Sequence, residues 1–394
     1  MTSFSFSLLT GETGPLEKGN RPDYLNIPVP YHTPVLNVGD QVLADTLVAR
    51  ADRENDGDVH SPLAGTITGI TPYAINIRVE GDDRAPSGEP APDGGNRLRQ
   101  WLRGLGADVR ALDRATTLIV NAVPPEPGIS ICEPLLRDYR KTVEIGLEAV
   151  KRIVEPTKLF LVAATGNQTS AFANCTVQHV APVHPNGMPQ MVIKAVTGQE
   201  ALPGTFANDT ALITVRELFL IGRVMETGRP VTETVMTIGS QNSLVRVGTP
   251  ASFLVAEAGG SVQPGDRIVL GGLMCGLSAR DLAQGIGKKT TGLYLIRPGE
   301  GSEPTDNACL GCGECERHCP ARIMPGMISR CAEFKQFKRA EQFHIHSCIE
   351  CGICGYWCTA QRPLLHYIRL AKYELALLAA ESDDKTATAA EEAR

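Results

Sequence analysis

Short apolar runs and amphipathic runs alternate through the middle of the chain. TTLIVNAV (116–123), KLFLVAA (158–164) and ALITV (211–215) are largely apolar and short, a pattern that predicts buried strands. LLRDYRKTVEIGLEAVKRIV (135–154) and RELFLIGRVMETG (216–228) instead place apolar residues at i, i+3 and i+4, which predicts helices. Strand and helix in alternation indicate an α/β domain with a parallel sheet.

The segments on either side of this region have a β pattern. Near the N-terminus, VLNVGDQVLADTLVAR and VHSPLAGTITGI contain short strands separated by turn residues, as in half of a lipoyl-domain barrel. The segment between them, ADRENDGD, has no Lys to carry a lipoyl group, so we predict a structural barrel. After residue 230, VTETVMTIG, SLVRVG, DRIVLGG and TTGLYLIRP predict strands, with one helix near TPASFLVAEAGG, which suits a small β-grasp domain.

The C-terminal segment is helical in pattern. The 28 residues between Cys319 and Cys348 contain helix formers and charges without β-branched alternation, and PLLHYIRLAKYELALLAA reads as an amphipathic helix. The polar end ESDDKTATAAEEAR is expected to fray.

Composition excludes several classes of protein. The 394 residues are 42% hydrophobic and 21% charged, as expected for a globular chain of about two to three domains. Aromatic residues make up only 5%, and the formal charge is −6, so we expect no nucleic-acid partner. No stretch approaches the roughly 20 apolar residues of a membrane span, and MTSFSFSLLTGETGP is not a secretory signal. We therefore expect a cytoplasmic protein with reduced thiols.

Eight of the twelve cysteines form two runs with one spacing. CLGCGECERHCP and CIECGICGYWCT both read C-x2-C-x2-C-x3-C, the spacing of bacterial ferredoxins that hold two [4Fe–4S] clusters. In that arrangement three close cysteines hold one cluster and the fourth reaches the other. We therefore assign the ligands in two crossed sets, which are Cys309, Cys312, Cys315 and Cys358 for the first cluster and Cys348, Cys351, Cys354 and Cys319 for the second.

Other uses of these cysteines fit less well. Two zinc ions would be held by pairs of cysteines rather than by triplets with a fourth at x3, and disulfides do not suit a reducing compartment. Pro320 follows the first run, but Thr359 follows the second, and we expect the cluster to tolerate this change because proline is no ligand. Cys331 is predicted to be a buried free thiol, and His318 a solvated side chain.

Taken in order, these segments resemble the C subunit of the Rnf electron transport complex. The resemblance rests on VGDQVLADTLVA with VHSPLAGTITGI, on VMTIGSQNSLVRVGTPASFLVAEAGG with GGLMCG, and on the two cysteine runs with the helical tail. Cobalamin reductase of propanediol microcompartments and the flavoprotein subunit of respiratory complex I look related. The resemblance implies a β-grasp domain of the SLBB type and electron transfer from NADH through FMN to iron–sulfur clusters. We predict a multidomain α/β plus β protein with these parts: a lipoyl-like barrel segment (1–92), a Rossmann-like α/β domain (93–230), a β-grasp domain (231–300), a helical ferredoxin domain (301–380) and a polar tail (381–394).

One part of the family pattern is missing. Members that use NADH carry a Gly-Gly-Ala-Gly-Phe-Pro loop before the first α/β strand, whereas this chain reads NRLRQWLRGLGADVRALD there. The next family motif, of the Asn-Gly-Ala-Glu-Cys-Glu-Pro type, reads NAVPPEP from Asn121 to Pro127 and keeps only one acid, Glu126. We therefore expect no bound FMN and interpret Glu126 as a structural loop residue.

The predicted function is electron relay through two [4Fe–4S] clusters between donor and acceptor redox proteins. We assign no catalytic residue, and expect a peripheral subunit on the inner face of a membrane redox complex or on a soluble oxidoreductase. Two alternatives remain open at this point. One is an NADH-dependent, FMN-containing subunit that feeds the clusters, and the other is a structural adaptor whose clusters only fold the helical domain.

Overall fold

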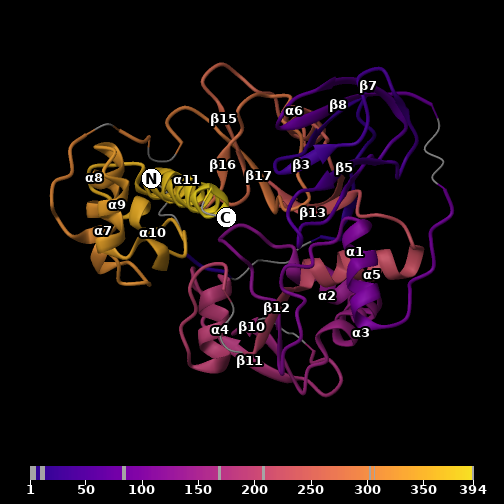
Figure 1. Cartoon of the computed structure of the whole chain (residues 1–394), viewed down its shortest axis with the longest axis horizontal. Helices are drawn as coiled ribbons and strands as arrows, with labels where there is room; N and C mark the ends of the chain where they lie inside the picture. Colours follow the sequence, from indigo (N-terminus) through magenta and orange to yellow (C-terminus); the bar gives the residue numbers. More distant parts are fainter. Residues whose placement is uncertain are drawn as a thin grey trace. The chain divides into compact units, whose positions relative to one another are not determined.

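The computed structural model describes residues 6–8, 14–81, 86–166, 170–205, 209–300, 303–305 and 307–392, with side chains up to residue 380. The chain divides into two compact units (Figure 1). The larger unit comprises Met1–Glu200 and Phe206–Pro298, and the smaller comprises Gly299–Arg394 with Ala201–Thr205. Several sheets and many helices make up the two units, so the expected mixed α/β multidomain class is confirmed.

A four-stranded parallel sheet lies at the centre of the α/β region. Its strands are β9 (Thr117–Asn121), β10 (Lys158–Ala164), β11 (Thr176–Val180) and β12 (Thr210–Thr214). They run in the order β11-β10-β9-β12, and every neighbouring pair is parallel. Three of these strands were expected from continuous apolar runs, which are typical of a sheet buried on both faces. The order reverses at β9, so the loop that follows Asn121 emerges at the switch point of the sheet.

Five helices accompany this sheet. They are α1 (Gly95–Gly104), α2 (Cys132–Asp138), α3 (Arg140–Val154), α4 (Pro189–Thr197) and α5 (Val215–Thr227). The single helix expected over 135–154 is instead two, because Tyr139 leaves the helical conformation with φ −120°. Helix α5 begins where expected, since Thr214 and Glu217 form a capping box that satisfies its first N–H groups.

Two small antiparallel sheets form the N-terminal region. Their strands are β2 (Tyr24–Pro28), β3 (His32–Pro34), β4 (Gln41–Val42), β5 (Leu47–Ala51), β6 (Val59–His60), β7 (Gly65–Ile70) and β8 (Ala74–Val79). One sheet has the order β2-β8-β7-β4 and the other β3-β5-β6. Alternate residues such as Leu25 and Ile27, or Ile75 and Ile77, point into a shared core and are fully buried. The short strands that the sequence predicts in this region are therefore present, and each sheet buries one of its faces.

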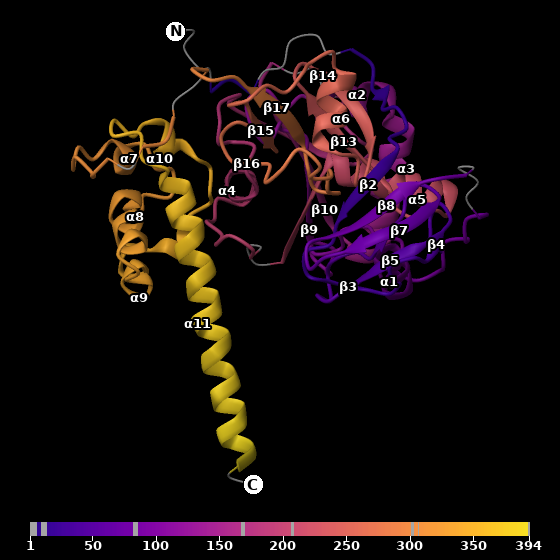
Figure 2. The same cartoon turned by 90° about the horizontal axis from the view of Figure 1, so that it is seen from above.

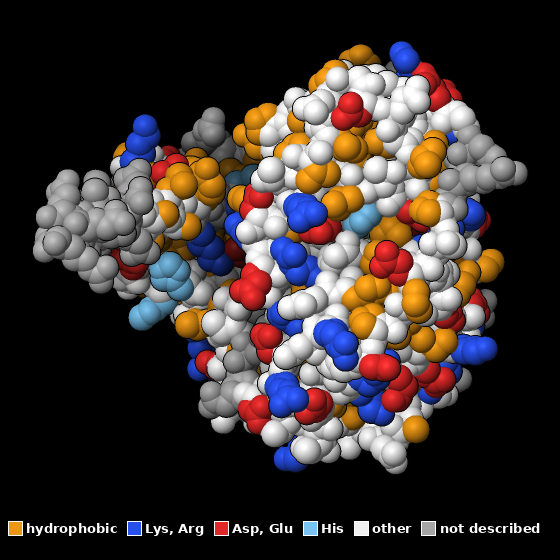
Figure 3. Space-filling view, turned by 45° about the vertical axis from the view of Figure 1, so that its right-hand side comes forward, with side chains coloured by type: hydrophobic (Ala, Val, Ile, Leu, Met, Phe, Trp, Pro, Cys, Tyr) orange, Lys and Arg blue, Asp and Glu red, His pale blue; other side chains and the backbone are white. Residues whose placement is uncertain are grey.

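A six-stranded sheet follows the α/β region. Its elements are β1 (Glu17–Lys18), β13 (Glu233–Ile238), β14 (Gln241–Arg246), β15 (Arg267–Leu270), β16 (Leu277–Ser278) and β17 (Gly292–Ile296), with helix α6 (Ala251–Glu257) beside them. The four strands and the helix expected after residue 230 are all present. Strand β1 is an addition from the N-terminus that pairs in parallel with β14, a long-range contact that no local pattern could reveal. Figure 3 shows acidic and basic side chains interspersed over the displayed face of this larger unit.

The smaller unit is helical. Its elements are α7 (Glu314–Arg317), α8 (Pro325–Glu333), α9 (Phe337–Ala340), η1 (Glu341–Phe343), η2 (Ile345–Ser347), α10 (Ile353–Tyr356) and α11 (Leu364–Glu392). Figure 2 shows α11 as one long helix that runs past the short ones. The core joins apolar residues such as Ile328, Ile345 and Ile368 to Cys348 and Cys354. The helical backbone continues into 381–392, where fraying was expected, because Ala, Glu and Lys in that stretch are strong helix formers.

Candidate functional site

The two cysteine runs share one backbone geometry. In each run the third cysteine lies on a four-residue helix, α7 or α10, which begins after a glycine with positive φ, Gly313 (77°) or Gly352 (78°). A second left-handed residue precedes it in each run, and this is Gly311 (68°) in the first and Glu350 (57°) in the second. Glycine adopts this conformation without strain, whereas glutamate does so at a cost. The same turns therefore recur at equivalent positions although one of the residues differs.

The fourth cysteine of each run lies near the other run. Burial is the main cause of the raised pKa of Cys315, and the charges of Cys309, Cys358 and Cys312 add to it. Cys358 belongs to the second run, yet it lies near Cys309, Cys312 and Cys315, the three close cysteines of the first run. The crossed sets require cysteines from both runs to lie around each cluster.

In the same way, Cys319 of the first run lies near the three close cysteines of the second run. A cavity in the smaller unit is lined by four thiols together with apolar walls from Ile323, Leu365 and Ile368. The four thiols belong to Cys319, Cys348, Cys351 and Cys354. Burial raises the pKa of Cys351 to about 12, and the charges of Cys348 and Cys319 add to the effect. A thiolate in such surroundings needs compensating positive charge, which iron supplies in a cluster.

Among the residues described by the structure, no three His, Cys, Asp or Glu side chains are close enough to hold one metal ion between them. The ligands of a cubane stand farther apart, because each binds a different iron of the inorganic core. Four soft sulfur donors in a largely apolar cavity are the kind of donor set that iron–sulfur clusters use.

The first triplet is more open to solvent. Cys309 and Cys312 are exposed and Cys315 is half-buried, whereas Cys348, Cys351 and Cys354 are 8%, 7% and 7% exposed.

Small and polar groups contact the sulfurs of the first set. Gly326 in α8 packs so closely that a Cβ there would lie 3.3 Å from Cys315 Sγ. The backbone N–H of Arg362 donates to Cys358 Sγ at 3.4 Å. The Thr359 hydroxyl lies 3.4 Å from Cys312 Sγ, and this hydrogen bond is the main cause of the lowered pKa of Cys312. None of these contacts follows from the cysteine spacing. The only sign of them in the sequence is that Thr359 stands where the first run has a proline.

Charged groups from α11 lie beside the second set. Lys372 donates to the backbone carbonyl of Cys348 at 2.8 Å and to Glu350 Oε1 at 2.8 Å. Arg369 donates to the other oxygen of Glu350 at 2.8 Å. Burial by itself would raise the pKa of Glu350, but these two cations outweigh it and lower that pKa. Helix α11 therefore brings positive charge to the buried cysteines.

Two further residues singled out in the sequence lie close to the cysteines. Cys331 is 4% exposed and packs in the core of the smaller unit, which confirms the predicted buried thiol. The His318 ring is half-buried and stacks on the Trp357 ring, with centroids 4.1 Å apart. The prediction of a solvated His318 is therefore wrong. An aromatic residue precedes the fourth cysteine of each run, His318 in the first and Trp357 in the second, and their side chains stack on each other.

Glu126 lies in the loop after β9 and is held by protein groups. Its side chain is buried, and Oε2 accepts hydrogen bonds from the N–H groups of Met274 at 2.9 Å and Cys275 at 2.8 Å. Burial, and next the Glu126 charge, raises the pKa of Tyr294. Asn121 bridges the same loop to the carbonyl of Gly187 at 3.0 Å. The interpretation of Glu126 as a structural loop residue matches these contacts, which tie the loop to a turn of the six-stranded sheet.

The segment 96–113, where the resemblance led us to look for a glycine-rich loop, is also packed by protein. A Cβ at Gly57 would clash with the carbonyl of Ala107, so these two segments of the chain are in direct backbone contact. The half-buried Lys288 donates to the carbonyls of Gly57, Asp58 and Gly106 at 3.1, 2.7 and 2.9 Å. Burial is the main cause that lowers the pKa of Lys288 to about 8. Sequence reasoning did not single out this lysine, because its partners are backbone carbonyls distant in sequence.

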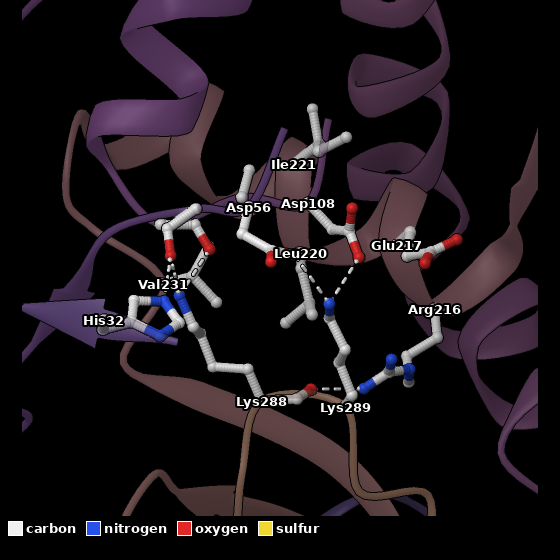
Figure 4. Close-up of a pocket in the computed structure, with 13 residues that line it drawn as sticks. His32, Asp56, Asp108, Arg216, Glu217, Leu220, Ile221, Val231, Lys288 and Lys289 are labelled. Atoms are coloured by element: carbon white, nitrogen blue, oxygen red, sulfur yellow. Dashed lines mark hydrogen bonds and ion pairs between the residues drawn. The ribbon is translucent and has the colours of Figure 1, made fainter. Parts of the chain in front are cut away.

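A pocket opens beside Lys288 (Figure 4). Lys289 crosses it and pairs with Asp56 at 3.1 Å and Asp108 at 3.3 Å. Arg216 donates to the carbonyl of Lys288 at 2.7 Å. The charged groups at this pocket thus hold the barrel segment, the 104–109 loop and α5 together.

Comparison with curated proteins finds similarity along most of the chain to the C subunits of oxidoreductase complexes. The C subunit of the proton-translocating ferredoxin:NAD(+) oxidoreductase complex of Clostridium ljungdahlii is 27% identical over 91% of this chain and 90% of its own length. The C subunit of the ion-translocating oxidoreductase complex of Actinobacillus succinogenes is 28% identical over 86% of this chain and 54% of its own. The corresponding subunit of Buchnera aphidicola is 26% identical over 70% and 62%. The chain thus spans less than two thirds of these last two relatives, and the resemblance to the C subunit of the Rnf complex is confirmed.

Two other comparisons add little. No family profile matches the chain. Among solved structures, the NAD+-reducing [NiFe]-hydrogenase in its H2-reduced state superposes with a TM-score of 0.43 and 10% identity, covering 68% of this chain and 58% of that one. So loose a superposition carries no argument.

Proposed function

From this similarity and the geometry of the cysteines, we propose that the chain is an electron-relay subunit with two [4Fe–4S] clusters. Cys309, Cys312, Cys315 and Cys358 hold the first cluster, and Cys348, Cys351, Cys354 and Cys319 hold the second. Clusters held by these cysteines would supply one-electron transfer chemistry. The observation that carries the proposal is the cavity that Cys319 of the first run shares with the three close cysteines of the second.

The protein supplies three things to this relay. The left-handed turns at Gly313 and Gly352 start the short helices that carry the third cysteine of each run. Apolar residues around the second set exclude water, which limits reorganisation when charge moves. Cysteines of both sets pack on the core of the smaller unit, so two clusters held there would lie close enough for an electron to pass without a large motion of the chain.

We further propose that the larger unit serves as scaffold and docking surface and binds no FMN. The loop after β9 is where a nucleotide would bind in an open α/β sheet, yet Glu126 there is engaged by two backbone N–H groups. At the position of the family's glycine loop, Gly106 is bonded to Lys288 and Ala107 packs on Gly57. These residues do not fit a flavin, so electrons enter from a partner rather than from NADH at this chain.

The finer domain assignments belong to the same proposal. The described strands support a lipoyl-like barrel segment in 1–92, a Rossmann-like domain in 93–230 and an SLBB-type β-grasp domain in 231–300. The helical two-cluster domain then occupies 301–380, where the smaller unit lies.

We propose that the chain works as a peripheral subunit on the cytoplasmic side of a membrane redox complex. The Clostridium relative is named as part of a proton-translocating complex. Within the described part of the chain, no helix combines the length and apolar character that crossing a bilayer requires. Recovery from both membrane and soluble fractions with redox proteins attached would support this placement. Recovery only as a free monomer after mild detergent would count against it.

Metal analysis of the anaerobically purified protein tests the relay. The two ligand sets predict about eight iron and eight sulfide per chain, and dithionite should bleach the visible absorption reversibly. Zinc at two per chain without sulfide would overturn the proposal. NADH should leave the absorption unchanged even when FMN is added. Rapid bleaching by NADH would instead support the flavin-containing alternative.

A further inference from the structure

Side-chain contacts of the two cysteine sets differ at one hydroxyl. Pro320 follows Cys319, but the equivalent position after Cys358 is Thr359. The Thr359 hydroxyl lies 3.4 Å from Sγ of Cys312, the second cysteine of the other run. Cys312 and Cys358 are in the same proposed set, so this contact joins the neighbour of one ligand to the sulfur of another.

The backbone contacts of the same cysteines are matched between the runs. Cys312 accepts from the backbone of Glu314, and its counterpart Cys351 accepts from the backbone of Ile353. Both donors stand two residues after their cysteine, which is a consequence of the shared turn. Proline at position 320 has no hydroxyl and no N–H to offer. Thr359 therefore gives the first set a side-chain donor that Pro320 cannot give the second.

We propose that Thr359 is a positioning residue that raises the reduction potential of the first cluster above the value it would have without the hydroxyl. This inference rests on the proposed function, because it requires a cluster on Cys312. A cysteine bound to iron carries no proton, so the hydroxyl must donate and the sulfur accept. Reduction adds one electron and makes the cluster more negative. A donor to the sulfur stabilises that added charge, and hydrogen bonds to sulfur are among the factors that set cluster potentials.

Solvent exposure acts in the same direction. Cys309 and Cys312 are exposed, whereas all three close cysteines of the second set are buried. Water stabilises the more negative reduced state better than an apolar core does. The hydroxyl and the exposure therefore both favour the reduced form of the first cluster.

Redox titration of the full chain, followed by electron paramagnetic resonance, tests this role. The signals of the two clusters are first assigned with Cys309→Ser and Cys354→Ser. Thr359→Val, which replaces the hydroxyl with a methyl group, should lower the ratio of reduced to oxidised first cluster about tenfold at a fixed ambient potential, or ~59 mV for a one-electron couple. The midpoint of the second cluster should not move. Thr359→Ser, which keeps the hydroxyl, should restore the original value.

Thr305→Val is the matched control. The Thr305 hydroxyl donates to the carbonyl of Ala360, next to Thr359, without a sulfur contact, so its loss should leave both midpoints in place. An unchanged or higher midpoint of the first cluster in Thr359→Val, or an equal shift of both clusters, would overturn the inference. Iron and sulfide are measured in every variant. A wild-type chain without two clusters would overturn the proposed function itself, which is a different result.

Discussion

The two cysteine runs have the same spacing and the same turns but different surroundings. Left-handed residues recur at matched positions, with Arg322 (φ 53°) three residues after Cys319 and Gln361 (φ 53°) three residues after Cys358. Yet the close cysteines of the second run are buried and two of those in the first are exposed. Spacing thus determines how the thiols are presented. The surrounding chain determines the dielectric environment and the charges that they meet.

Helix α11 accounts for much of this difference. It packs on the second run and supplies Arg369 and Lys372 to Glu350. The position equivalent to Glu350 in the first run is Gly311, which has no side chain to pair. The second site is therefore built into the core of the smaller unit, and the first lies at its edge.

The largest expected effect comes from removing one ligand of each set. Cys354→Ser should abolish the second cluster and lower the melting temperature of the smaller unit by on the order of 10 °C, because that cluster fills part of its core. Cys309→Ser should abolish the first cluster with a smaller effect on stability. Calorimetry with iron analysis checks both. Equal losses of stability would show that burial of the thiols does not distinguish the sites.

The crossed assignment predicts the next effect. Cys319→Ser should damage the cluster of Cys348, Cys351 and Cys354, because Cys319 lines their cavity. The cluster on the three close cysteines of the first run should stay intact. Cys358→Ser is the matched variant and should do the reverse. Electron paramagnetic resonance of the two variants is the measurement. Loss of the first cluster in Cys319→Ser would show that each run holds its own cluster.

A glycine next to the first set gives a smaller, steric effect. Gly326→Val should lower the occupancy of the first cluster several-fold, since even a Cβ there would lie 3.3 Å from Cys315 Sγ and 3.9 Å from Cys309 Sγ. Gly355→Ala, where a Cβ would meet nothing within 4 Å, is the control and should retain both clusters. Iron content and the two resonance signals report the result. Full occupancy in Gly326→Val would mean that α8 does not confine the first cluster.

The smallest effect concerns pH. The pKa of Glu350 is lowered below its ordinary 4.5 in the folded chain by Lys372 and Arg369 despite burial. A carboxyl with a lowered folded pKa stabilises the fold above its ordinary pKa, and this contribution disappears as the pH falls below about 4.5. Glu350→Gln should therefore cost about 1 kcal/mol at neutral pH and less in acid.

Thermal melts of the smaller unit between pH 7 and pH 3.5 check the Glu350 prediction. Glu316→Gln, which changes an exposed residue of the first run, should follow the wild-type curve throughout. A constant difference between Glu350→Gln and wild type at every pH would contradict an ionic contribution from α11.

The sequence alone indicated three of the four strands and two helical segments of the α/β region, the helical C-terminal unit and the eight candidate ligands, but not β11, α1 or α4. It did so because apolar periodicity and the x2-x2-x3 spacing are local properties of the chain. The absence of the glycine-rich loop that the resemblance implies was also visible in the sequence. The break at Tyr139 and the short strand β1 were not, since each depends on contacts made by distant residues.

Only the tertiary structure decided what surrounds each candidate site. It brought Thr359 to Cys312, α11 to the second run, His318 onto Trp357 and Lys288 to three backbone carbonyls. These contacts join residues between 19 and 231 positions apart. Burial and long-range hydrogen bonds depend on how the whole chain packs, so a spacing rule gives the ligands but not the environment in which they work.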